Sequence, residues 1–414
     1  SVRRPLLNDR APYIFRSTDF GKTWTRITAG LGAEDYVHAV REDPTRRGLL
    51  YAATQHGVRI SYDDGGSWQH LNLNLPDVPV ADLVVEHDEL VIGTHGRGFW
   101  VLDNLGPLRQ ATAAVLAADA HLFTPAAGRR SSPGTTLAWR FGTAPRRATL
   151  AILDSAGAVL REFAGDTTPA GAGAGMGRRR GSATTFPLAA GLTRFSYDLR
   201  AQGIEGFPGM ILWGAGTAGP ALPPGRYTVR LTADGRVLTA PLRIVRSPLL
   251  PEVTDADLRA QYAFGVKVRD KATEANRGVI DIRSVKAQLD NRLGRSDDGA
   301  LKAAGGTLRT NASAVEVKLY QVKNQSGQDP LNFPIKVNNR LANLLSMAER
   351  GDGPPGTYMP EILGILSKEL AGYTAELAAV WARDLAAVNA ELTRLQLPPI
   401  DPKCREVAGC AVRP

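Results

Sequence analysis

Short runs rich in apolar and β-branched residues fill the N-terminal part of the chain, several of them alternating with polar positions. They lie at 37–40, 49–53, 58–62 and 67–71, and again at 81–86, 89–93 and 98–103. Runs of this length and composition predict β-strands. Four strands in about 44 residues are typical of one blade of a β-propeller.

The pattern S-x-D-x-G-x-[ST]-W occurs twice, at 17–24 and 61–68, so that the two copies begin 44 residues apart. Each copy lies between two predicted strands and is therefore expected to form a hairpin turn. In such a turn Asp accepts hydrogen bonds from backbone amides, Gly takes a positive φ, and Trp packs over the hairpin. The residues predicted to build the turns are Ser17, Asp19, Gly21, Trp24, Ser61, Asp63, Gly65 and Trp68.

Residues 1–108 hold only two to three blades, because no further Asp turn follows the last of these strands. A closed propeller needs at least about four blades. An incomplete stack would expose the edge and the apolar face of its terminal blade. We therefore expect the chain to be the C-terminal part of a longer protein, whose missing N-terminal sequence supplies the remaining blades.

A second β-rich segment follows. Residues 109–134 are predicted to be a linker, and the strand-like runs and hairpin turns of 135–247 predict an immunoglobulin-like β-sandwich. A Gly- and Arg-rich stretch at 169–182 interrupts it. Its glycines do not follow G-x-G-x-x-G and no strand-to-helix context surrounds them, so they predict a flexible insertion rather than a phosphate-binding loop.

The pattern becomes helical over 252–397, before a tail at 398–414. Thr254 and Asp257 fit a capping box at the start of the first helix. Apolar residues at steps of three and four then predict long amphipathic helices in a small antiparallel bundle. In the first helix this stripe comprises Val268, Ala272, Ala275, Val279, Ile282, Leu289 and Leu293. The predicted fold class is thus multidomain β + α.

A polar loop at 324–334 interrupts the helical pattern and contains several amides and an Asp. Such side chains can bond to backbone groups of another segment or form a recognition surface. We favour the first role, in which the loop fastens the helices to the β-sandwich. Phe333 and Pro334 are expected to form a buried clip, with Asn332 beside them.

Composition agrees with a folded, soluble chain: 43% of residues are hydrophobic and 22% are charged. No apolar run reaches the roughly 20 residues of a membrane-spanning helix. The net charge of +9 is scattered, and no nucleic-acid-binding motif accompanies it, so we expect a solvated basic surface and no nucleic acid partner. Cys404 and Cys410 are spaced for a small disulfide loop in an oxidising compartment.

The two Asp turns resemble the Asp-box, or BNR repeat, of sialidase-like and sortilin-like β-propellers. The segment THGRGFWVLD at 94–103 and residues 320–344 are similar to the C-terminal region of large bacterial proteins usually labelled glycosyl hydrolase with BNR repeats or sortilin-like. The resemblance covers the whole chain and implies a secreted protein, extracellular or periplasmic. An Asp-box is specific for the propeller hairpin, but it does not specify an activity, since glycosidases and receptors share it.

In a propeller the Asp-box turns lie at one face and the links between blades open on the other. By that geometry the candidate ligand-face residues are Glu34, Asp35, Tyr36, His56, His95 and Arg97. Arg can clamp a carboxylate or sugar hydroxyls, and His can hydrogen-bond or transfer a proton. The alternative is that His95 and Arg97 only stabilise the last blade, with Gly96 and Gly98 required by the turn.

A glycosidase needs two carboxylates across the scissile bond. The candidates here are Glu34, Asp35, Asp77 and Asp82, and no spacing selects a pair. We find no H-E-x-x-H, G-x-S-x-G, P-loop or EF-hand motif, and expect no metal site and no cofactor. The favoured function is therefore a structural or binding role toward a glycan or protein ligand. The alternative is a glycoside hydrolase whose catalytic carboxylates lie mainly in the missing N-terminal blades.

Overall fold

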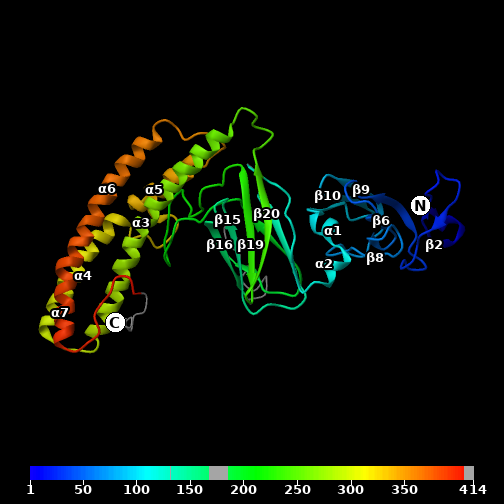
Figure 1. The fold of residues 1–414 in the computed structure, drawn as a ribbon. Coiled ribbons are helices and arrows are strands. Elements are labelled where there is room, and N and C mark those ends of the chain that lie inside the picture. Colours follow the sequence, from blue (N-terminus) through cyan, green and yellow to red (C-terminus); the bar gives the residue numbers. More distant parts are fainter. Residues whose placement is uncertain (131, 167–184, 405–414) are drawn as a thin grey trace.

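The computed structural model describes residues 1–130, 132–166 and 185–404 and has a mixed β and α, multidomain architecture. Three parts follow one another along an elongated molecule: small sheets at the N-terminus, a larger β unit in the middle, and long helices at the C-terminal end (Figure 1). Each part has its own buried apolar residues. The Gly- and Arg-rich stretch at 169–182 lies outside the described residues.

The N-terminal part is built from small antiparallel sheets. Strands β5 to β8 form a four-stranded sheet in sequence order, and β9 to β11 form a three-stranded sheet in the order β11-β10-β9. The strands are β1 Val2–Arg4, β2 Asp9–Tyr13, β3 Phe15–Arg16, β4 Thr25–Arg26, β5 Val37–Glu42, β6 Leu50–Thr54, β7 Gly57–Ser61, β8 Gln69–His70, β9 Val80–Glu86, β10 Glu89–Thr94 and β11 Phe99–Leu102. The strands expected from the apolar pattern overlap β5 to β11 in every case, with end points that differ by a few residues.

The two Asp turns have the same hydrogen bonds. Asp63 accepts hydrogen bonds from Ser61 Oγ (2.8 Å), Ser67 N (2.8 Å) and Ser67 Oγ (2.7 Å). Asp19 accepts the equivalent three from Ser17 and Thr23. The bonds from Thr23 and Ser17 lower the pKa of Asp19 to about 2. Gly21 and Gly65 have φ of 86° and 85°, so both take the positive φ that the motif predicts.

The two motif tryptophans differ in their surroundings. Trp68 is 5% exposed, and its indole Nε1 donates to the carbonyl of Ile27 at 2.9 Å, in the segment after β4. Trp24 is 62% exposed, and its Nε1 donates to Gly21 O within its own turn. Trp24 thus lies over its own hairpin, as predicted, whereas Trp68 packs against the neighbouring segment 25–30.

The middle part consists of two sheets with a common core. One has the order β13-β20-β19-β15-β16-β17 and the other β12-β14-β18. Trp139, Phe186 and Phe195 pack together between the sheets. The strands are β12 Ala120–Leu122, β13 Gly128–Arg129, β14 Thr135–Phe141, β15 Ala148–Leu153, β16 Val159–Asp166, β17 Thr185–Pro187, β18 Gly191–Tyr197, β19 Gly225–Ala233 and β20 Arg236–Val245.

The segment expected to be a linker, 109–134, contains regular structure. Helix α1 (Gly106–Gln110) reaches into it, helix α2 (Ala113–Ala117) follows, and β12 and β13 each add a strand to one of the two middle sheets. Pro- and Ser-rich composition suggested a connection without pairing partners. The partners of β12 and β13 are β14 and β20, which lie further along the chain, so local composition gave no sign of these pairings.

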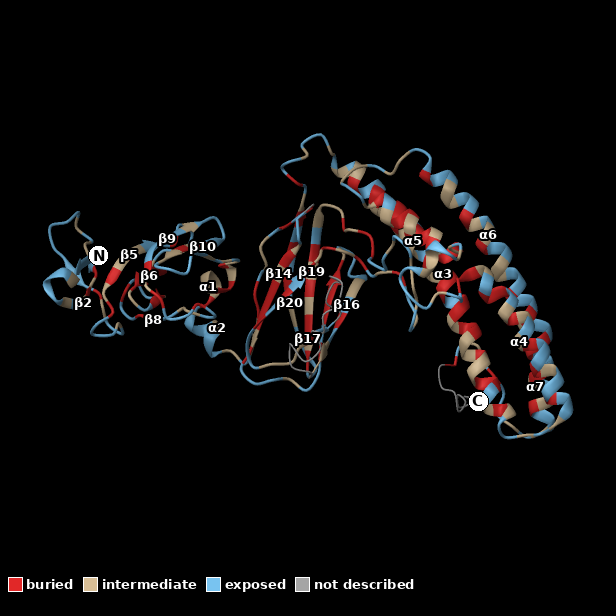
Figure 2. Cartoon of the chain, turned by 180° about the vertical axis from the view of Figure 1, so that it is seen from behind, coloured by how far each residue is buried: buried red, intermediate tan, exposed pale blue. Residues whose placement is uncertain are grey.

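The C-terminal part is helical. Its helices are α3 Asp255–Leu293, α4 Gly299–Leu319, α5 Val337–Ala348, α6 Met359–Val380 and α7 Ala386–Arg394, with a short π-helical turn, Trp381–Leu385, between the last two. The predicted capping box is present, since Thr254 Oγ1 accepts from Asp257 N while Asp257 accepts from Thr254 N. The inward faces of these helices are buried and their outward faces are exposed (Figure 2). All of the stripe predicted for α3 is buried except Leu293, which is half-buried.

An irregular segment of the middle part, 199–222, runs onto the helices and is held there by buried amides. Asn339 Oδ1 accepts from Trp213 N at 2.7 Å, and Asn339 Nδ2 donates to Trp213 O at 2.9 Å. Asn276 donates to Glu205 O at 2.8 Å and accepts from Asn338 at 3.0 Å. These three amides on α3 and α5, rather than the loop at 324–334, fasten the helices to the β unit.

The loop at 324–334 bonds mainly within itself. Asp329 accepts hydrogen bonds from the backbone amides of Gln325 and Ser326. Asn332 and Pro334 are exposed, and Phe333 is half-buried with Lys323 Nζ 5.4 Å from its ring centroid. The expected buried clip is therefore wrong, because Pro334 is exposed and Phe333 is only half-buried.

Replacing Asn339 by Ala should lower the melting temperature clearly, since it removes two buried hydrogen bonds worth about 1–3 kcal/mol in total. The matched control is the double variant Asn332→Ala/Phe333→Ala, which changes two exposed or half-exposed positions near the start of the same helix. We expect its melting temperature to stay within about one or two degrees of the parent. If the double variant melts earlier than Asn339→Ala in calorimetry, the assignment of the fastening to α5 is wrong.

Candidate functional site

The strand directions separate the N-terminal sheets into two ends. Both Asp turns follow strand ends at one of them, since β3 ends at Arg16 and β7 at Ser61. The segments 34–36 and 55–56 lie at the opposite end of the sheet. There Val37, the first residue of β5, is paired with Thr54, the last residue of β6, and Thr54 is paired with Gly57, the first residue of β7. Residues 95–98 connect β10 and β11 at the corresponding end of the next sheet. We call this second end the polar end.

Asp35 is buried at the polar end and serves the fold. It is 2% exposed, and its Oδ2 accepts from Arg59 Nε at 2.8 Å and from Arg59 Nη2 at 2.5 Å. Its other oxygen accepts from His56 N at 3.2 Å. The Asp35 carboxylate thus joins the segment before β5 to the turn between β6 and β7 and to β7 itself. Because it is buried and bonded to these groups, Asp35 is not the ligand-face residue that the sequence suggested.

The backbone N–H of His56 bonds to Asp35, but its imidazole ring lies beside Asp77. Its Nδ1 lies 3.0 Å from Asp77 Oδ1, and both side chains are largely exposed. Gln55, the other residue of this turn, donates its backbone N–H to Tyr36 O at 3.1 Å. The turn at 55–56 and the segment at 34–36 are thus joined, with the His56 imidazole at the surface.

His38 belongs to the polar end although sequence reasoning did not select it. Its Nδ1 lies 2.7 Å from Arg3 Nη1, and its ring lies 5.1 Å from that of Tyr36. Burial lowers the pKa of His38, Arg3 lowers it further, and a hydrogen bond with Gln55 acts in the opposite direction. The available signal was the alternation in β5, where His38 is a polar position between buried Val37 and Ala39.

The turn that carries His95 and Arg97 is shaped by its glycines. Gly96 and Gly98 have φ of 85° and 69°, and Thr94 N donates to Gly98 O at 3.1 Å. His95 N donates to Pro79 O, and Arg97 donates its N–H to Thr94 Oγ1. The backbone of both residues is therefore structural, as one of the two interpretations expected. Their side chains are exposed, and the Arg97 guanidinium has no ion pair or hydrogen bond within the described part of the chain.

The four carboxylates considered for catalysis do not form a pair. Asp35 is bound by Arg59, Asp77 by His56, and Asp82 by Arg41 at 2.9 Å. Glu34 is exposed and has no ion pair among the described residues. Within the same residues, His, Cys, Asp and Glu nowhere gather in a group of three that could hold a metal ion. The polar end is thus better suited to hydrogen bonding than to the acid and base roles of a glycosidase.

Comparisons with known proteins do not identify a family for this chain. No family model matches the chain, and no curated protein matches it. The search of solved structures finds CopC from Methylosinus trichosporium OB3b, with 16% identity over 31% of this chain and 94% of that one, at a TM-score of 0.16. It also finds the extracellular domain of a protein assigned as a hybrid two-component system from B. thetaiotaomicron (10% identity, 58% of this chain, TM-score 0.19) and an ancestral GH74 enzyme (12%, 56%, 0.19).

The last two matches span only 29% and 28% of those longer chains. At such scores none of the three carries an argument about this protein. Among the described residues, no helix combines the length and the apolar character needed to cross a membrane.

Proposed function

We propose that this chain is the C-terminal portion of an extracytoplasmic Asp-box β-propeller protein that binds a glycan or protein ligand at the polar end. The observation that carries the proposal is the pair of turns with matching hydrogen bonds at one end of the sheets, opposite an end rich in His, Arg and Tyr. In this arrangement the Asp turns are structural and the opposite end is free for a ligand.

The same proposal assigns finer folds to the three parts. The two-stranded sheets β1-β2 and β3-β4 together, the sheet β5–β8 and the sheet β9–β11 would be consecutive blades. The docking of Trp68 on Ile27 would be the contact between two of them. The middle part would be an immunoglobulin-like sandwich, and α3 to α7 an antiparallel bundle. By equivalence with Trp68, exposed Trp24 would be covered by a blade from upstream sequence.

A glycan is the ligand that the side chains favour. Arg97 offers a guanidinium that has no ion pair or hydrogen bond with any described residue, and His56 and His95 offer exposed rings that can bond to hydroxyl groups. The Tyr36 ring provides a partly apolar surface of the kind on which a sugar ring can lie. Hydrolysis by these residues is disfavoured, because Asp35 and Asp82 form ion pairs with arginines and Asp77 is in hydrogen-bond contact with His56.

An extracytoplasmic location is part of the proposal. Cys404 takes part in a disulfide, and no cysteine among the described residues is free. Disulfides persist mainly in oxidising compartments. Cys410, which the sequence offers as a partner, lies outside the described residues.

The test is a glycan array followed by titration of the bound glycan into the chain and two variants. Arg97→Ala removes the guanidinium of Arg97 from the polar end and should weaken binding about tenfold, the effect of losing one charge-assisted contact. Arg47→Ala is the matched control, because Arg47 is exposed at the opposite end of the same sheets, before β6. We expect Arg47→Ala to bind like the parent.

Three outcomes would contradict the proposal as argued for glycans. They are the absence of any bound glycan on the array, an equal loss of affinity in the two variants, and the release of reducing sugar from the bound glycan. The last outcome would favour the glycoside hydrolase alternative. Absence of glycan binding together with an Arg97-dependent protein partner would favour a protein ligand.

A further inference from the structure

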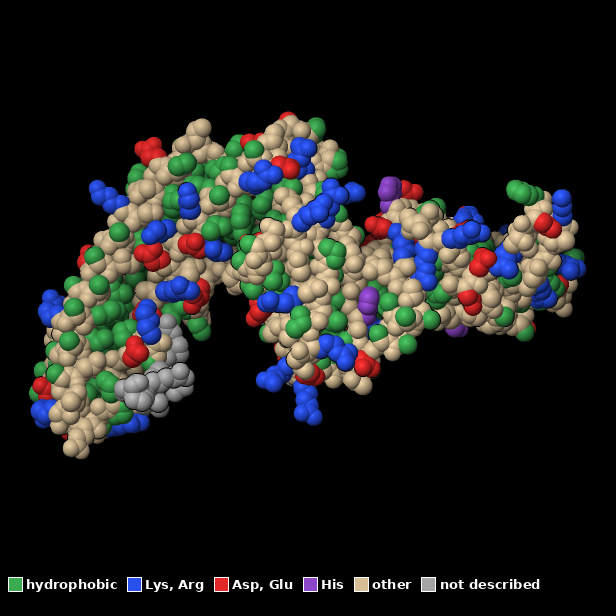
Figure 3. All heavy atoms as spheres, in the orientation of Figure 1, with side chains coloured by type: hydrophobic (Ala, Val, Ile, Leu, Met, Phe, Trp, Pro, Cys, Tyr) green, Lys and Arg blue, Asp and Glu red, His purple; other side chains and the backbone are tan. Residues whose placement is uncertain are grey.

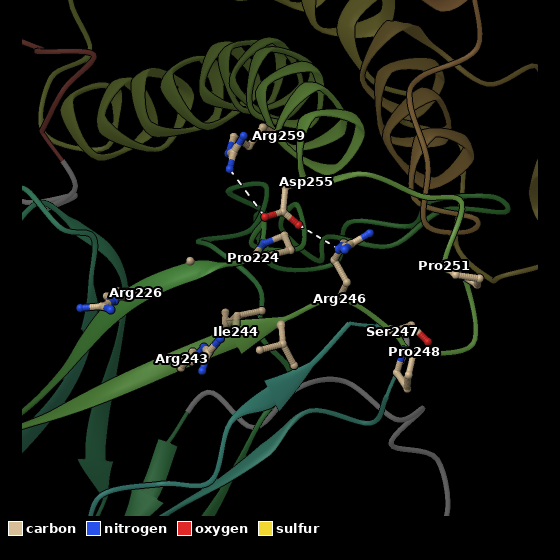
Figure 4. A pocket seen from close by; sticks show the side chains of 12 residues that line it. Pro224, Arg226, Arg243, Ile244, Arg246, Ser247, Pro248, Pro251, Asp255 and Arg259 are labelled. Carbon is tan, nitrogen blue, oxygen red and sulfur yellow. Dashed lines mark ion pairs between the residues drawn. The ribbon is translucent and has the colours of Figure 1, made fainter.

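A cavity of about 670 Å³ lies where the middle part meets the helices, far from the polar end. Residues of β19, β20 and the connection to α3 line it, together with the first turns of α3 (Figure 4). Four arginines contribute to the wall, Arg226, Arg243, Arg246 and Arg259, against one acidic residue, Asp255. Lys and Arg side chains gather on the molecular surface over the upper part of the middle unit, close to the helices (Figure 3).

Asp255 is shared by two of these arginines. Its Oδ1 lies 3.1 Å from Arg246 Nε and its Oδ2 lies 3.7 Å from Arg259 Nη2, as the dashed lines of Figure 4 mark. Arg246 Nη1 also donates to Val253 O at 2.7 Å. One carboxylate thus balances only part of the charge of this pair, and it holds Arg246 in a fixed orientation.

Arg226 and Arg243 have no such partner. They are directly opposite each other in the register of β19 and β20, and both are exposed. Cβ atoms at such positions are about 4.5–5.5 Å apart, and like charges there destabilise the pair. Within the described residues neither guanidinium has an ion pair or a hydrogen bond. No described side chain therefore balances the repulsion between these two guanidinium groups.

We propose that this cavity binds an oxyanion, either free sulfate or phosphate or the sulfate or phosphate ester of a small molecule. Guanidinium groups match the oxygens of such anions in a two-pronged geometry, and an anion between Arg226 and Arg243 would relieve their repulsion. The N-terminus of α3 is already satisfied by Thr254 and Asp257, so the arginines provide the recognition.

The volume and the lining of the cavity favour a small ligand. Its volume lies within the range of about 300–1,000 Å³ that is usual for small-molecule sites. Three prolines, Pro224, Pro248 and Pro251, line it and restrict its backbone. All four arginines line this one cavity, whereas a nucleic acid strand would need basic groups along an extended groove.

Isothermal titration calorimetry, in which the anion is titrated into the complete chain at low ionic strength, tests the proposal. The probes are sodium sulfate and sodium phosphate, with sodium chloride at matched ionic strength as the blank. Arg226→Gln/Arg243→Gln should weaken sulfate or phosphate binding at least about tenfold, since two charge-assisted contacts are lost. Arg236→Gln is the control, an exposed arginine of the same hairpin outside the cavity lining, and should bind like the parent.

Binding that the double variant loses and Arg236→Gln keeps supports the site. Absence of binding to both anions, or equal loss in both variants, overturns it. Circular dichroism of the double variant, whose substituted residues are exposed, separates loss of binding from loss of fold. A sulfated heparin disaccharide that binds tighter than free sulfate would identify an ester ligand, and weaker binding a free anion. Tighter binding of a short single-stranded oligonucleotide through the same arginines overturns the small-ligand assignment.

Discussion

Replacing Trp68 by Ala is expected to lower the free energy of unfolding of the N-terminal sheets by about 3–5 kcal/mol, the usual effect of truncating a buried Trp. The indole belongs to the buried apolar cluster that also contains Ile14, Ile27 and Val37, and its Nε1 donates to the carbonyl of Ile27. The substitution leaves a cavity between the second Asp turn and the segment after β4. Equilibrium urea unfolding measures the effect.

The matched control is Trp24→Ala at the same position of the first Asp turn. Trp24 is largely exposed, so its truncation should change the free energy of unfolding by no more than about 0.5 kcal/mol. The Ser and Asp hydrogen bonds of the two turns are the same, and the two indoles differ in where they bond: Trp24 Nε1 to Gly21 O within its own turn, Trp68 Nε1 to Ile27 O outside it. The comparison therefore tests the contact between neighbouring sheets. Equal losses in the two variants would mean that the tryptophans act within their own hairpins and that the packing of Trp68 on Ile27 contributes nothing.

Features set by short stretches of sequence could be predicted well. The Asp turns depend on residues at most a few positions apart, and their hydrogen bonds are those expected from Ser, Asp and Gly at those places. The start of α3 likewise follows from Thr254 and Asp257 alone. Strands β6 and β7 of the four-stranded sheet are recognisable because both are buried along their whole length and end at turns.

Features that depend on residues distant in sequence were missed. Asp35 looked like a surface carboxylate, because nothing near it in the chain identifies Arg59 as its partner. The segment held by Asn339 is 126 positions away from it, and its fastening gave no local pattern. The arginine cavity depends on the register of β19 against β20, which places Arg226 opposite Arg243. Apolar periodicity fixes the face of each residue, but these polar pairings depend on how the elements are assembled.

A second set of hydrogen bonds between the β unit and the helices, besides those of the three asparagines, centres on one arginine. Arg130 is 5% exposed and follows β13 directly. Its guanidinium donates to Asp352 at 2.6 Å, to Gln261 Oε1 at 2.6 Å and to Leu222 O at 3.1 Å. Gln261 in turn donates to the carbonyls of Ala348 and Gly351. A single buried cation thus joins the end of β13, helix α3 and the loop after α5.

Arg130→Met should therefore lower the free energy of unfolding by about 3–5 kcal/mol, because it removes the cation beside a buried carboxylate and a buried amide. We also expect the β unit and the helices, which this network joins, to unfold at more clearly separated temperatures in calorimetry. Arg236→Met is the control, since its ion pair with Asp119 is exposed and worth about 0–1 kcal/mol.

The double variant Arg130→Met/Asp352→Leu distinguishes two causes of the loss of stability. One is the Asp352 carboxylate left without its cation, and the other is the loss of the remaining hydrogen bonds of Arg130. Replacing a whole buried ion pair by apolar residues of similar size is often close to neutral, whereas removing one partner is not. The double variant should therefore be more stable than Arg130→Met alone. If the two are equally unstable, the loss comes from the bonds of Arg130 to Gln261 and Leu222, and the Asp352 carboxylate contributes little to joining the two parts.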